Sequence, residues 1–253
     1  MYVDEQLRYL YDLVPKTDCT TWRGVLLQLY SKTRNVNFPT SIRNFVTDLA
    51  ATDKYIPRLS TFSNDEQQFR LRNYFKFAFF REPLNRLASA YQDKLDNRNN
   101  AFFEDKYGVY IIKTYRQNAT SEALASGRGV TFEEFIQYLV DEVKKKPEEL
   151  DFHWRPQHLV AQPCSVRYDY IGKFENLDEE AREVIQIIGG SGLVEYPSRS
   201  DGGYNNPIYR NKTLKMFARI PKVSIETLLQ LYEIDYKLFN YQVPKFDSLS
   251  IAI

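Results

Sequence analysis

The segment 74–80 is apolar on both faces of an extended chain, and it constrains the fold more than any other part of the sequence. Phe75, Phe77 and Phe79 alternate on one face, and Ala78 lies on the other. A strand that is apolar on both sides is typical of the middle of a sheet covered by helices on both faces. We therefore expect this segment to be a central strand.

Strand-like and helix-like segments alternate around this strand. Residues 9–14 are predicted to form a strand, and the apolar spacing of residues 22–29 predicts a helix with Thr20 or Thr21 as its N-cap. Further predicted elements are helices at 84–95, 131–143 (with a capping box from Thr131 to Glu134), 177–188 and 223–239, a strand at 168–172, and irregular segments at 33–65 and 190–212. The alternation predicts an α/β fold in which residues 1–253 form a single domain with a central, mostly parallel sheet flanked by helices.

The composition excludes several classes of protein. The 253 residues include 34 Lys and Arg against 33 Asp and Glu, and a net charge of +1 argues against a nucleic-acid partner. The two cysteines cannot by themselves form a four-ligand zinc site, and His153 and His158, five residues apart, are a poor metal centre, so we expect no metal. No stretch approaches the roughly 18 to 20 apolar residues of a membrane span. Asn118 and Asn211 lie in acceptor sequences for N-glycosylation.

The first candidate site is the loop between the predicted strand at 9–14 and the helix after it. It carries Lys16 and continues through Thr20 and Thr21 to Arg23. In open α/β sheets, ligands gather at the carboxyl ends of strands, and the N–H groups at a helix N-terminus favour anions. The loop has the charged and hydroxyl groups that a phosphate or sulfate ester requires, although it lacks the glycines of a Walker A loop. Alternatively, Lys16 is a solvated loop lysine.

The second candidate site follows the central strand. Arg81 lies at the end of this strand, and Ser89 comes two helical turns later, with Arg86 between them. A phosphate monoester can be held between the guanidinium of Arg81 and the hydroxyl of Ser89. The alternatives are that Ser89 lies on a helix surface and that Arg81 pairs with Glu82 or Asp93.

Together the two loops resemble the Golgi carbohydrate sulfotransferases, and most closely the branch of chondroitin and dermatan 4-O-sulfotransferases. The resemblance covers nearly the whole chain from about residue 9 and includes Tyr107-Gly108, Phe132-Glu-Glu-Phe135, His153-Trp154, Pro163-Cys164, Tyr168-Asp169 and Gly172-Lys173. It implies a P-loop-like sulfotransferase fold that binds 3′-phosphoadenylyl sulfate (PAPS). The implied reaction moves a sulfuryl group from PAPS to a glycosaminoglycan hydroxyl, with the GalNAc 4-OH of chondroitin or dermatan as the favoured acceptor.

The resemblance also implies roles for the candidate residues. Lys16 and its loop are implied to bind the 5′-phosphosulfate and to stabilise charge on the leaving phosphate. Arg81 and Ser89 are implied to anchor the 3′-phosphate, with Arg23 and Arg86 as weaker candidates. The donor-binding residues implied in this way are Pro15, Lys16, Thr17, Cys19, Thr20, Thr21, Trp22, Arg23, Arg81, Arg86 and Ser89.

His153 is the candidate general base, because a sugar hydroxyl must lose its proton and histidine has the side-chain pKa nearest neutrality. The alternative is a histidine that only packs beside Trp154. The resemblance also implies a histidine between the two donor loops, but residues 24–80 contain none.

Asp18 departs from the pattern of the family, which has a small residue there. A carboxylate about 4 Å from a phosphosulfate is unfavourable by about 4 kcal/mol at an effective dielectric constant of about 20, unless it points away. It can instead cap the following helix, and we favour this interpretation slightly. Together with the missing histidine, Asp18 supports an alternative function, that of a catalytically silent glycan- or nucleotide-binding protein. A nucleotide kinase is less favoured, because nothing resembles its phosphate loop or magnesium-binding carboxylate.

Two further expectations concern the cysteines and the location. Cys19 and Cys164 match cysteines of the family, and we favour buried free thiols over a disulfide. The resemblance implies a single-pass type II membrane protein of the Golgi lumen. We expect its membrane anchor and stalk to be absent from this chain.

Overall fold

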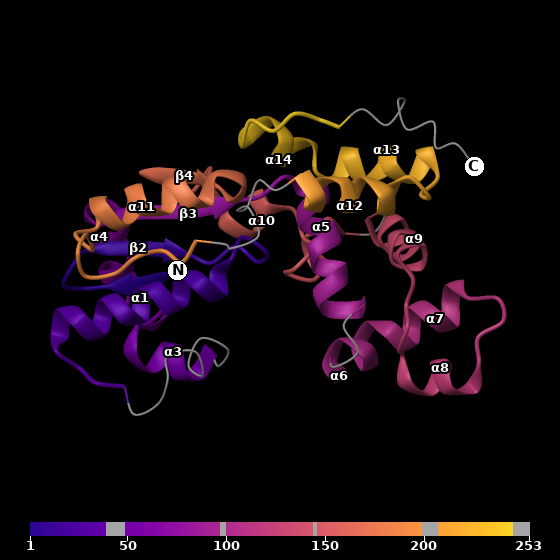
Figure 1. Cartoon of the computed structure of the whole chain (residues 1–253), viewed down its shortest axis with the longest axis horizontal. Helices are drawn as coiled ribbons and strands as arrows, with labels where there is room; N and C mark the ends of the chain where they lie inside the picture. The colour runs from indigo at the N-terminus through magenta and orange to yellow at the C-terminus, as the bar shows by residue number, and fades with distance from the viewer. Residues whose placement is uncertain (39–48, 97–99, 144–145, 199–206, 245–253) are drawn as a thin grey trace. The chain divides into compact units, whose positions relative to one another are not determined.

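The computed structural model describes residues 1–38, 49–96, 100–143, 146–198 and 207–244. The contacts within the chain divide it into two compact units (Figure 1). The first unit comprises Met1–Arg81 and Ala161–Asn206, and the second comprises Glu82–Val160 and Pro207–Ile253. The first unit contains the sheet, and the described part of the second is helical.

One mixed, four-stranded sheet runs through the first unit. Its strands are β1 (Tyr2–Asp4), β2 (Tyr9–Asp12), β3 (Phe75–Phe80) and β4 (Tyr170–Lys173), in the spatial order β1-β2-β3-β4. β3 is parallel to both β2 and β4, whereas β1 is antiparallel to β2. The predicted central strand and mostly parallel sheet are therefore confirmed, and β1 is an additional edge strand.

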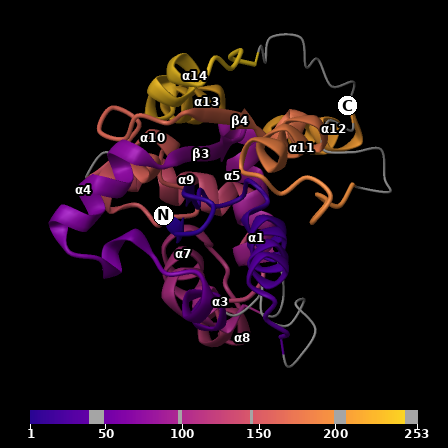
Figure 2. The same cartoon turned by 90° about the vertical axis from the view of Figure 1, so that its left-hand side faces the viewer.

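Helices flank this sheet. α1 (Cys19–Arg34) and α11 (Leu177–Ile187) pack on the face that carries Phe77 and Phe79 (Figure 2). Gly172 pairs with Phe79 in the ladder, and a Cβ atom at Gly172 would come within 2.3 Å of the Phe79 ring. Glycine at this position thus lets the ring lie across β4. The unit also contains α3 (Leu49–Tyr55) and α4 (Asn64–Asn73).

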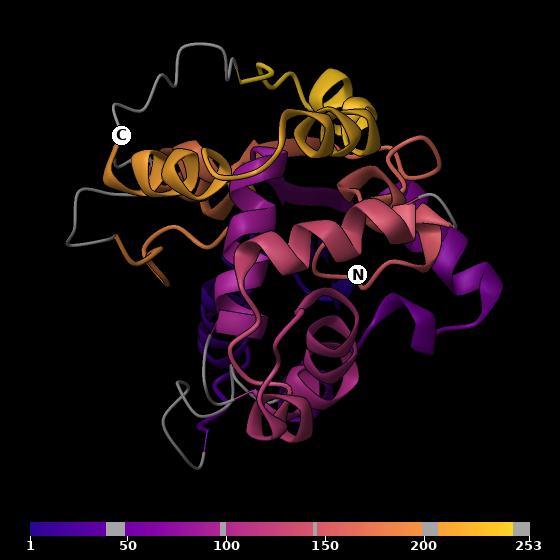
Figure 3. The same ribbon diagram turned by 90° about the vertical axis from the view of Figure 1, so that its right-hand side faces the viewer.

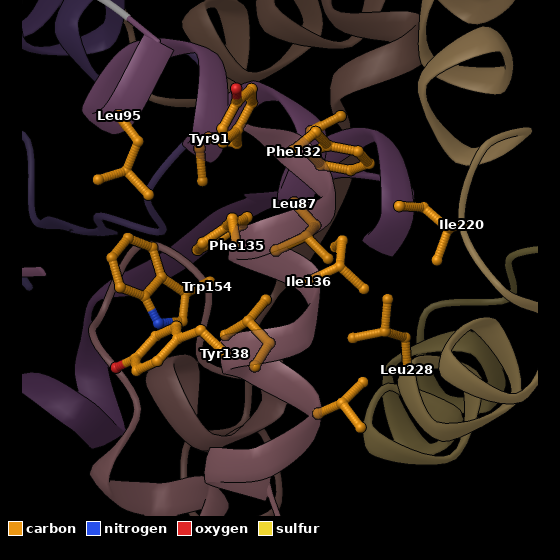
Figure 4. Packing of buried hydrophobic residues seen from close by; sticks show 14 of the residues in the cluster. Leu87, Tyr91, Leu95, Phe132, Phe135, Ile136, Tyr138, Trp154, Ile220 and Leu228 are labelled. Atoms are coloured by element: carbon orange, nitrogen blue, oxygen red, sulfur yellow. The ribbon is translucent and has the colours of Figure 1, made fainter. Parts of the chain in front are cut away.

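The second unit has a hydrophobic core of its own. Its helices are drawn in Figure 3. Its helices are α5 (Pro83–Tyr91), α6 (Ala101–Phe103), α7 (Val109–Tyr115), α8 (Ser121–Ser126), α9 (Phe132–Val143), α10 (Gln157–Ala161), α12 (Pro207–Phe217), α13 (Lys222–Leu231) and α14 (Glu233–Leu238). Leu87 from α5 and Phe135 from α9 pack with the indole of Trp154, which is fully buried (Figure 4).

Several local predictions can be compared with these elements. The predicted capping box of α9 is confirmed, because the Thr131 N–H donates to Glu134 Oε2 (2.8 Å) and the Glu134 N–H donates to Thr131 Oγ1 (3.2 Å). The N-cap of α1 is Asp18, so the expectation of Thr20 or Thr21 was wrong. The segments predicted to be irregular contain α3 and part of α12, although residues 39–48 and 199–206 lie outside the described residues. Among the described helices, none is long and apolar enough to cross a bilayer.

Candidate functional site

The loop between β2 and α1 has an unusual backbone. Lys16 and Asp18 have φ angles of 70° and 64°, in the left-handed region that non-glycine residues rarely occupy. Between them Thr17 is fully buried, and its hydroxyl donates to the carbonyl of Val14 (2.8 Å). Backbone strain of this kind persists where the surrounding structure enforces it and is concentrated at ligand sites. Left-handed residues also turn backbone N–H groups into the concave arrangement that binds anions.

A buried cation accompanies this loop. Arg23 on the first turns of α1 is only 6% exposed, and its Nη2 lies 3.5 Å from the hydroxyl of Thr20. Within the described part of the chain, its Nε and Nη1 atoms have no hydrogen-bond partner. Two unpaired nitrogens on a buried guanidinium are unfavourable, so an anion bound beside Nε and Nη1 would satisfy them. The first turn of α1 also contains no acidic residue, which leaves its N–H groups suited to an anion.

Arg81 connects the two candidate loops. It lies directly after β3, and its Nη1 donates to the backbone carbonyl of Lys16 (3.3 Å). Its guanidinium also lies over the ring of Phe174, 4.1 Å from the centroid. The parallel pairing of β2 with β3 brings the carboxyl ends of both strands to one edge of the sheet, which explains why these loops meet.

Several other residues of the first loop that were predicted to bind the donor are buried or partly buried. Pro15 is buried, and the ring of Trp22 is fully buried among aromatic rings that include Tyr11 (5.7 Å) and Phe79 (5.1 Å). Burial raises the pKa of the half-buried Cys19 thiol, so this thiol stays protonated near neutral pH and is a poor nucleophile. The buried ring of Trp22 anchors α1, the helix that carries Thr20 and Arg23.

Asp18 does not cap α1 as favoured from the sequence. It occupies the N-cap position, but its carboxylate accepts no hydrogen bond from a backbone N–H of the helix. Instead it accepts hydrogen bonds from the hydroxyls of Thr21 (2.9 Å) and Tyr196 (3.0 Å). The left-handed backbone of Asp18 explains the difference, because a typical N-cap residue is extended.

The second unit carries Arg86 and Ser89 on α5. Arg86 is 1% exposed and donates to the carbonyls of Phe152 (3.1 Å) and Arg155 (2.8 Å), which flank the His153-Trp154 pair. Its guanidinium therefore braces the backbone around His153. Ser89 is half-buried on the same helix.

His153 is held by a carboxylate. Its Nδ1 lies 2.8 Å from Asp151 Oδ1, and Asp151 also accepts hydrogen bonds from the His153 N–H (3.0 Å) and from the hydroxyl of Tyr107 (2.9 Å). Because a carboxylate only accepts, Nδ1 carries the proton in the neutral ring and Nε2 is the basic nitrogen. The imidazole is 24% exposed and lies edge-on to the ring of Phe103 (5.3 Å). This pairing is the arrangement expected of an oriented general base.

The same pairing predicts a pH dependence of stability. Burial raises the pKa of Asp151, but hydrogen bonds from His153 and Tyr107 outweigh it and lower this pKa from 3.8 to about 2. A lowered carboxyl pKa stabilises the fold above the unfolded-state value, and that contribution is lost as the pH falls. We expect the stability of the wild type relative to Asp151→Asn to decrease from pH 4 towards pH 2. Urea unfolding over this pH range measures the difference, and a constant difference would contradict the proposed pairing.

A second histidine–carboxylate pair was not predicted. His158 Nδ1 lies 2.7 Å from Oδ1 of Asp235, which is fully buried and also accepts the N–H groups of Gln157 (2.7 Å) and His158 (2.9 Å). His158 and Asp235 are separated by 77 positions in the sequence, so no local pattern indicates that they pair. Among the described residues, no group of three or more His, Cys, Asp or Glu side chains is placed to bind a metal. Cys19 and Cys164 are both free, and Cys164 is exposed rather than buried as expected.

Comparisons with known proteins show the family of the chain. The model of the sulfotransferase family matches residues 1–242. Similar proteins include carbohydrate sulfotransferase 11 of Mus musculus, which is 34% identical over 97% of this chain and 68% of its own length. Carbohydrate sulfotransferase 14 of Danio rerio is 35% identical (96% of this chain, 62% of its own), and carbohydrate sulfotransferase 9 of Homo sapiens is 32% identical (96% and 53%).

No solved structure matches the chain significantly. The assignment therefore rests on the family match over nearly the whole chain and on relatives that align over most of its length. The chain belongs to the sulfotransferase family and, within it, to the carbohydrate sulfotransferases.

Proposed function

We propose that this carbohydrate sulfotransferase uses PAPS to sulfate a glycosaminoglycan at the GalNAc 4-OH of chondroitin or dermatan, with residues 1–253 acting as one catalytic domain. The observation that carries the donor assignment is Arg23, a buried guanidinium whose Nε and Nη1 have no hydrogen-bond partner in the described part of the chain. It adjoins a loop with a lysine and left-handed backbone at the N-terminus of a helix. These groups fit a phosphosulfate, whose several charged oxygens need donors from more than one direction.

In the proposed reaction, PAPS supplies an activated sulfuryl group. The acceptor oxygen bonds to sulfur as the bond from sulfur to the 5′-phosphate oxygen breaks, and the electron pair of that bond leaves with the phosphate. Lys16 and the loop N–H groups stabilise the charge that develops on the departing phosphate. Arg81 and Ser89 anchor the 3′-phosphate and so fix the position of the donor.

His153 completes the proposed proton balance. Its Nε2 accepts the proton of the attacking hydroxyl, while Asp151 on Nδ1 keeps the tautomer and stabilises the imidazolium that forms. Arg86 helps to position this histidine, because it donates hydrogen bonds to the backbone carbonyls on both sides of it. The similarity to carbohydrate sulfotransferases 11 and 14 supports a sugar acceptor. The choice of GalNAc 4-OH and of the Golgi lumen rests on the resemblance of the sequence motifs to the chondroitin and dermatan 4-O-sulfotransferases.

The test is sulfate transfer from radiolabelled PAPS to desulfated chondroitin, dermatan and heparosan, followed by disaccharide analysis. We expect label at the GalNAc 4-OH of chondroitin or dermatan. His153→Ala is expected to lower kcat about 100-fold, the effect typical of losing a general base. His158→Asn is the matched control, because it removes another carboxylate-paired histidine while its amide N–H can still donate to Asp235, and it is expected to retain most of the activity.

Other outcomes would contradict parts of the proposal. Label on heparosan alone would overturn the acceptor assignment. Binding of 3′-phosphoadenosine 5′-phosphate (PAP) without transfer to any acceptor would favour the catalytically silent binding protein. Equal losses in the two histidine variants would remove the special role of His153.

A further inference from the structure

The carboxylate of Asp18 is held on both of its oxygens. Oδ1 accepts the hydroxyl of Thr21 (2.9 Å), and Oδ2 accepts the hydroxyl of Tyr196 (3.0 Å). The Tyr196 side chain is itself fixed, because the residue is only 6% exposed and its ring lies 5.0 Å from that of Trp22 in the core of the first unit. A buried tyrosine far along the chain thus sets the direction of a carboxylate in the strained loop.

This arrangement matters because of the charges around it. Lys16 lies two residues before Asp18, and Arg23 lies on the first turns of the helix that Asp18 precedes. The proposed occupant of this loop is an anion, and a carboxylate that turns towards an anion repels it. The hydroxyls of Thr21 and Tyr196 oppose this rotation of the carboxylate, since each would lose a charge-assisted hydrogen bond.

We propose that Tyr196 is a positioning residue for donor binding, which holds the carboxylate of Asp18 away from the donor's phosphosulfate. Asp18 is then compatible with donor binding because Tyr196 and Thr21 hold its carboxylate. This inference rests on the proposed function, because it takes the Lys16 loop to be the donor site.

The inference predicts a coupling of definite sign between two substitutions. Tyr196→Phe removes the hydroxyl but keeps the ring that packs on Trp22, so Oδ2 of Asp18 loses that donor, Oδ1 keeps the hydroxyl of Thr21, and the core packing is preserved. We expect this variant to bind PAP about tenfold more weakly, which corresponds to about 1.4 kcal/mol. Asp18→Ala is expected to bind PAP as well as the wild type or more tightly. The double variant is expected to bind like Asp18→Ala, because the carboxylate is absent.

The experiment is titration calorimetry of PAP with the wild type, both single variants and the double variant. Tyr170→Phe is the control, because it removes another tyrosine hydroxyl of the same unit that donates to a carboxylate, that of Glu183 (2.7 Å). It should leave PAP binding unchanged. Melting temperatures show whether each variant is folded under the conditions of the titration.

The outcomes separate this inference from the proposed function. If Tyr196→Phe weakens binding equally in the wild-type and Asp18→Ala backgrounds, or does not weaken it at all, the inference is wrong while the donor site stands. If Asp18→Ala itself weakens PAP binding as much as Tyr196→Phe does, the hydrogen bond between Asp18 and Tyr196 only stabilises the structure of the loop, and the inference is again wrong. If the wild type binds no PAP, the proposed donor site and the inference fail together.

Discussion

Replacing Lys16 by alanine is expected to lower kcat for sulfuryl transfer about 1000-fold, the upper range for removing one preorganised group that stabilises developing charge. The lysine lies in the left-handed loop beside the N-terminus of α1, and its carbonyl accepts a hydrogen bond from Arg81 (3.3 Å). Alanine keeps the Cβ atom and the backbone carbonyl, so the loop is preserved and the ammonium group is the main loss. Initial rates with radiolabelled PAPS give kcat and the KM for PAPS.

Lys32→Ala provides the matched control for charge. Lys32 lies in the last turn of the same helix, is exposed, and carries the same charge. We expect its removal to leave kcat within about twofold, because exposed charges at a distance are screened by salt. A Lys16→Ala variant with a raised KM for PAPS but an unchanged kcat would show that the ammonium binds the ground state and the transition state equally. No change in either parameter would remove this loop from the donor site.

The second large effect concerns stability. Asp235→Ala is expected to reduce the free energy of unfolding by about 3 to 5 kcal/mol, because three donors lose one buried acceptor and each loss costs about 1 to 3 kcal/mol. The carboxylate is fully buried and accepts three hydrogen bonds, from the N–H groups of Gln157 and His158 and from the His158 ring. Its removal leaves these donors without their acceptor in a region closed to water.

Glu233→Ala on the same helix is the control for this stability measurement. Glu233 is exposed and forms an ion pair with Lys237 one turn away, which contributes about 0.5 kcal/mol at most. Urea unfolding followed by tryptophan fluorescence in a Trp22→Phe background reports on the second unit, because Trp154 is then the remaining tryptophan and is buried there, with its carbonyl accepting the hydroxyl of Tyr232 (2.6 Å). A loss below about 1 kcal/mol for Asp235→Ala would show that water or a rearranged backbone replaces the carboxylate.

Elements with strong periodic patterns were predicted correctly. β3 and α9 were both anticipated, because alternating phenylalanines and a capping box are local signals that tertiary packing reinforces. The edge strand β1 was not predicted. The turn after it is closed by Asp4, whose carboxylate accepts the N–H groups of Gln6 (2.9 Å) and Leu7 (2.8 Å). A three-residue strand has too little periodicity to be recognised alone.

The start of α4 shows a signal that was present but not used. The Ser63 N–H donates to the Glu66 carboxylate (3.0 Å), which completes a capping box inside a segment predicted to be irregular. In contrast, nothing local predicts the pairing of His158 with Asp235, because the two residues meet only when α10 and α14 pack in the same unit.

The sequence by itself determined the parallel strands, the helices with clear apolar faces, and the position of Lys16 and Arg81 in loops that follow parallel strands. These features follow from periodicity and from the rule that ligands gather where parallel strands end. Only the tertiary structure decided the direction of each charged side chain. Arg86 braces a backbone, Arg23 is buried with donors unsatisfied, and Asp18 turns to Tyr196. The physical reason is that hydrogen bonds and burial depend on partners far along the chain, which local patterns do not encode.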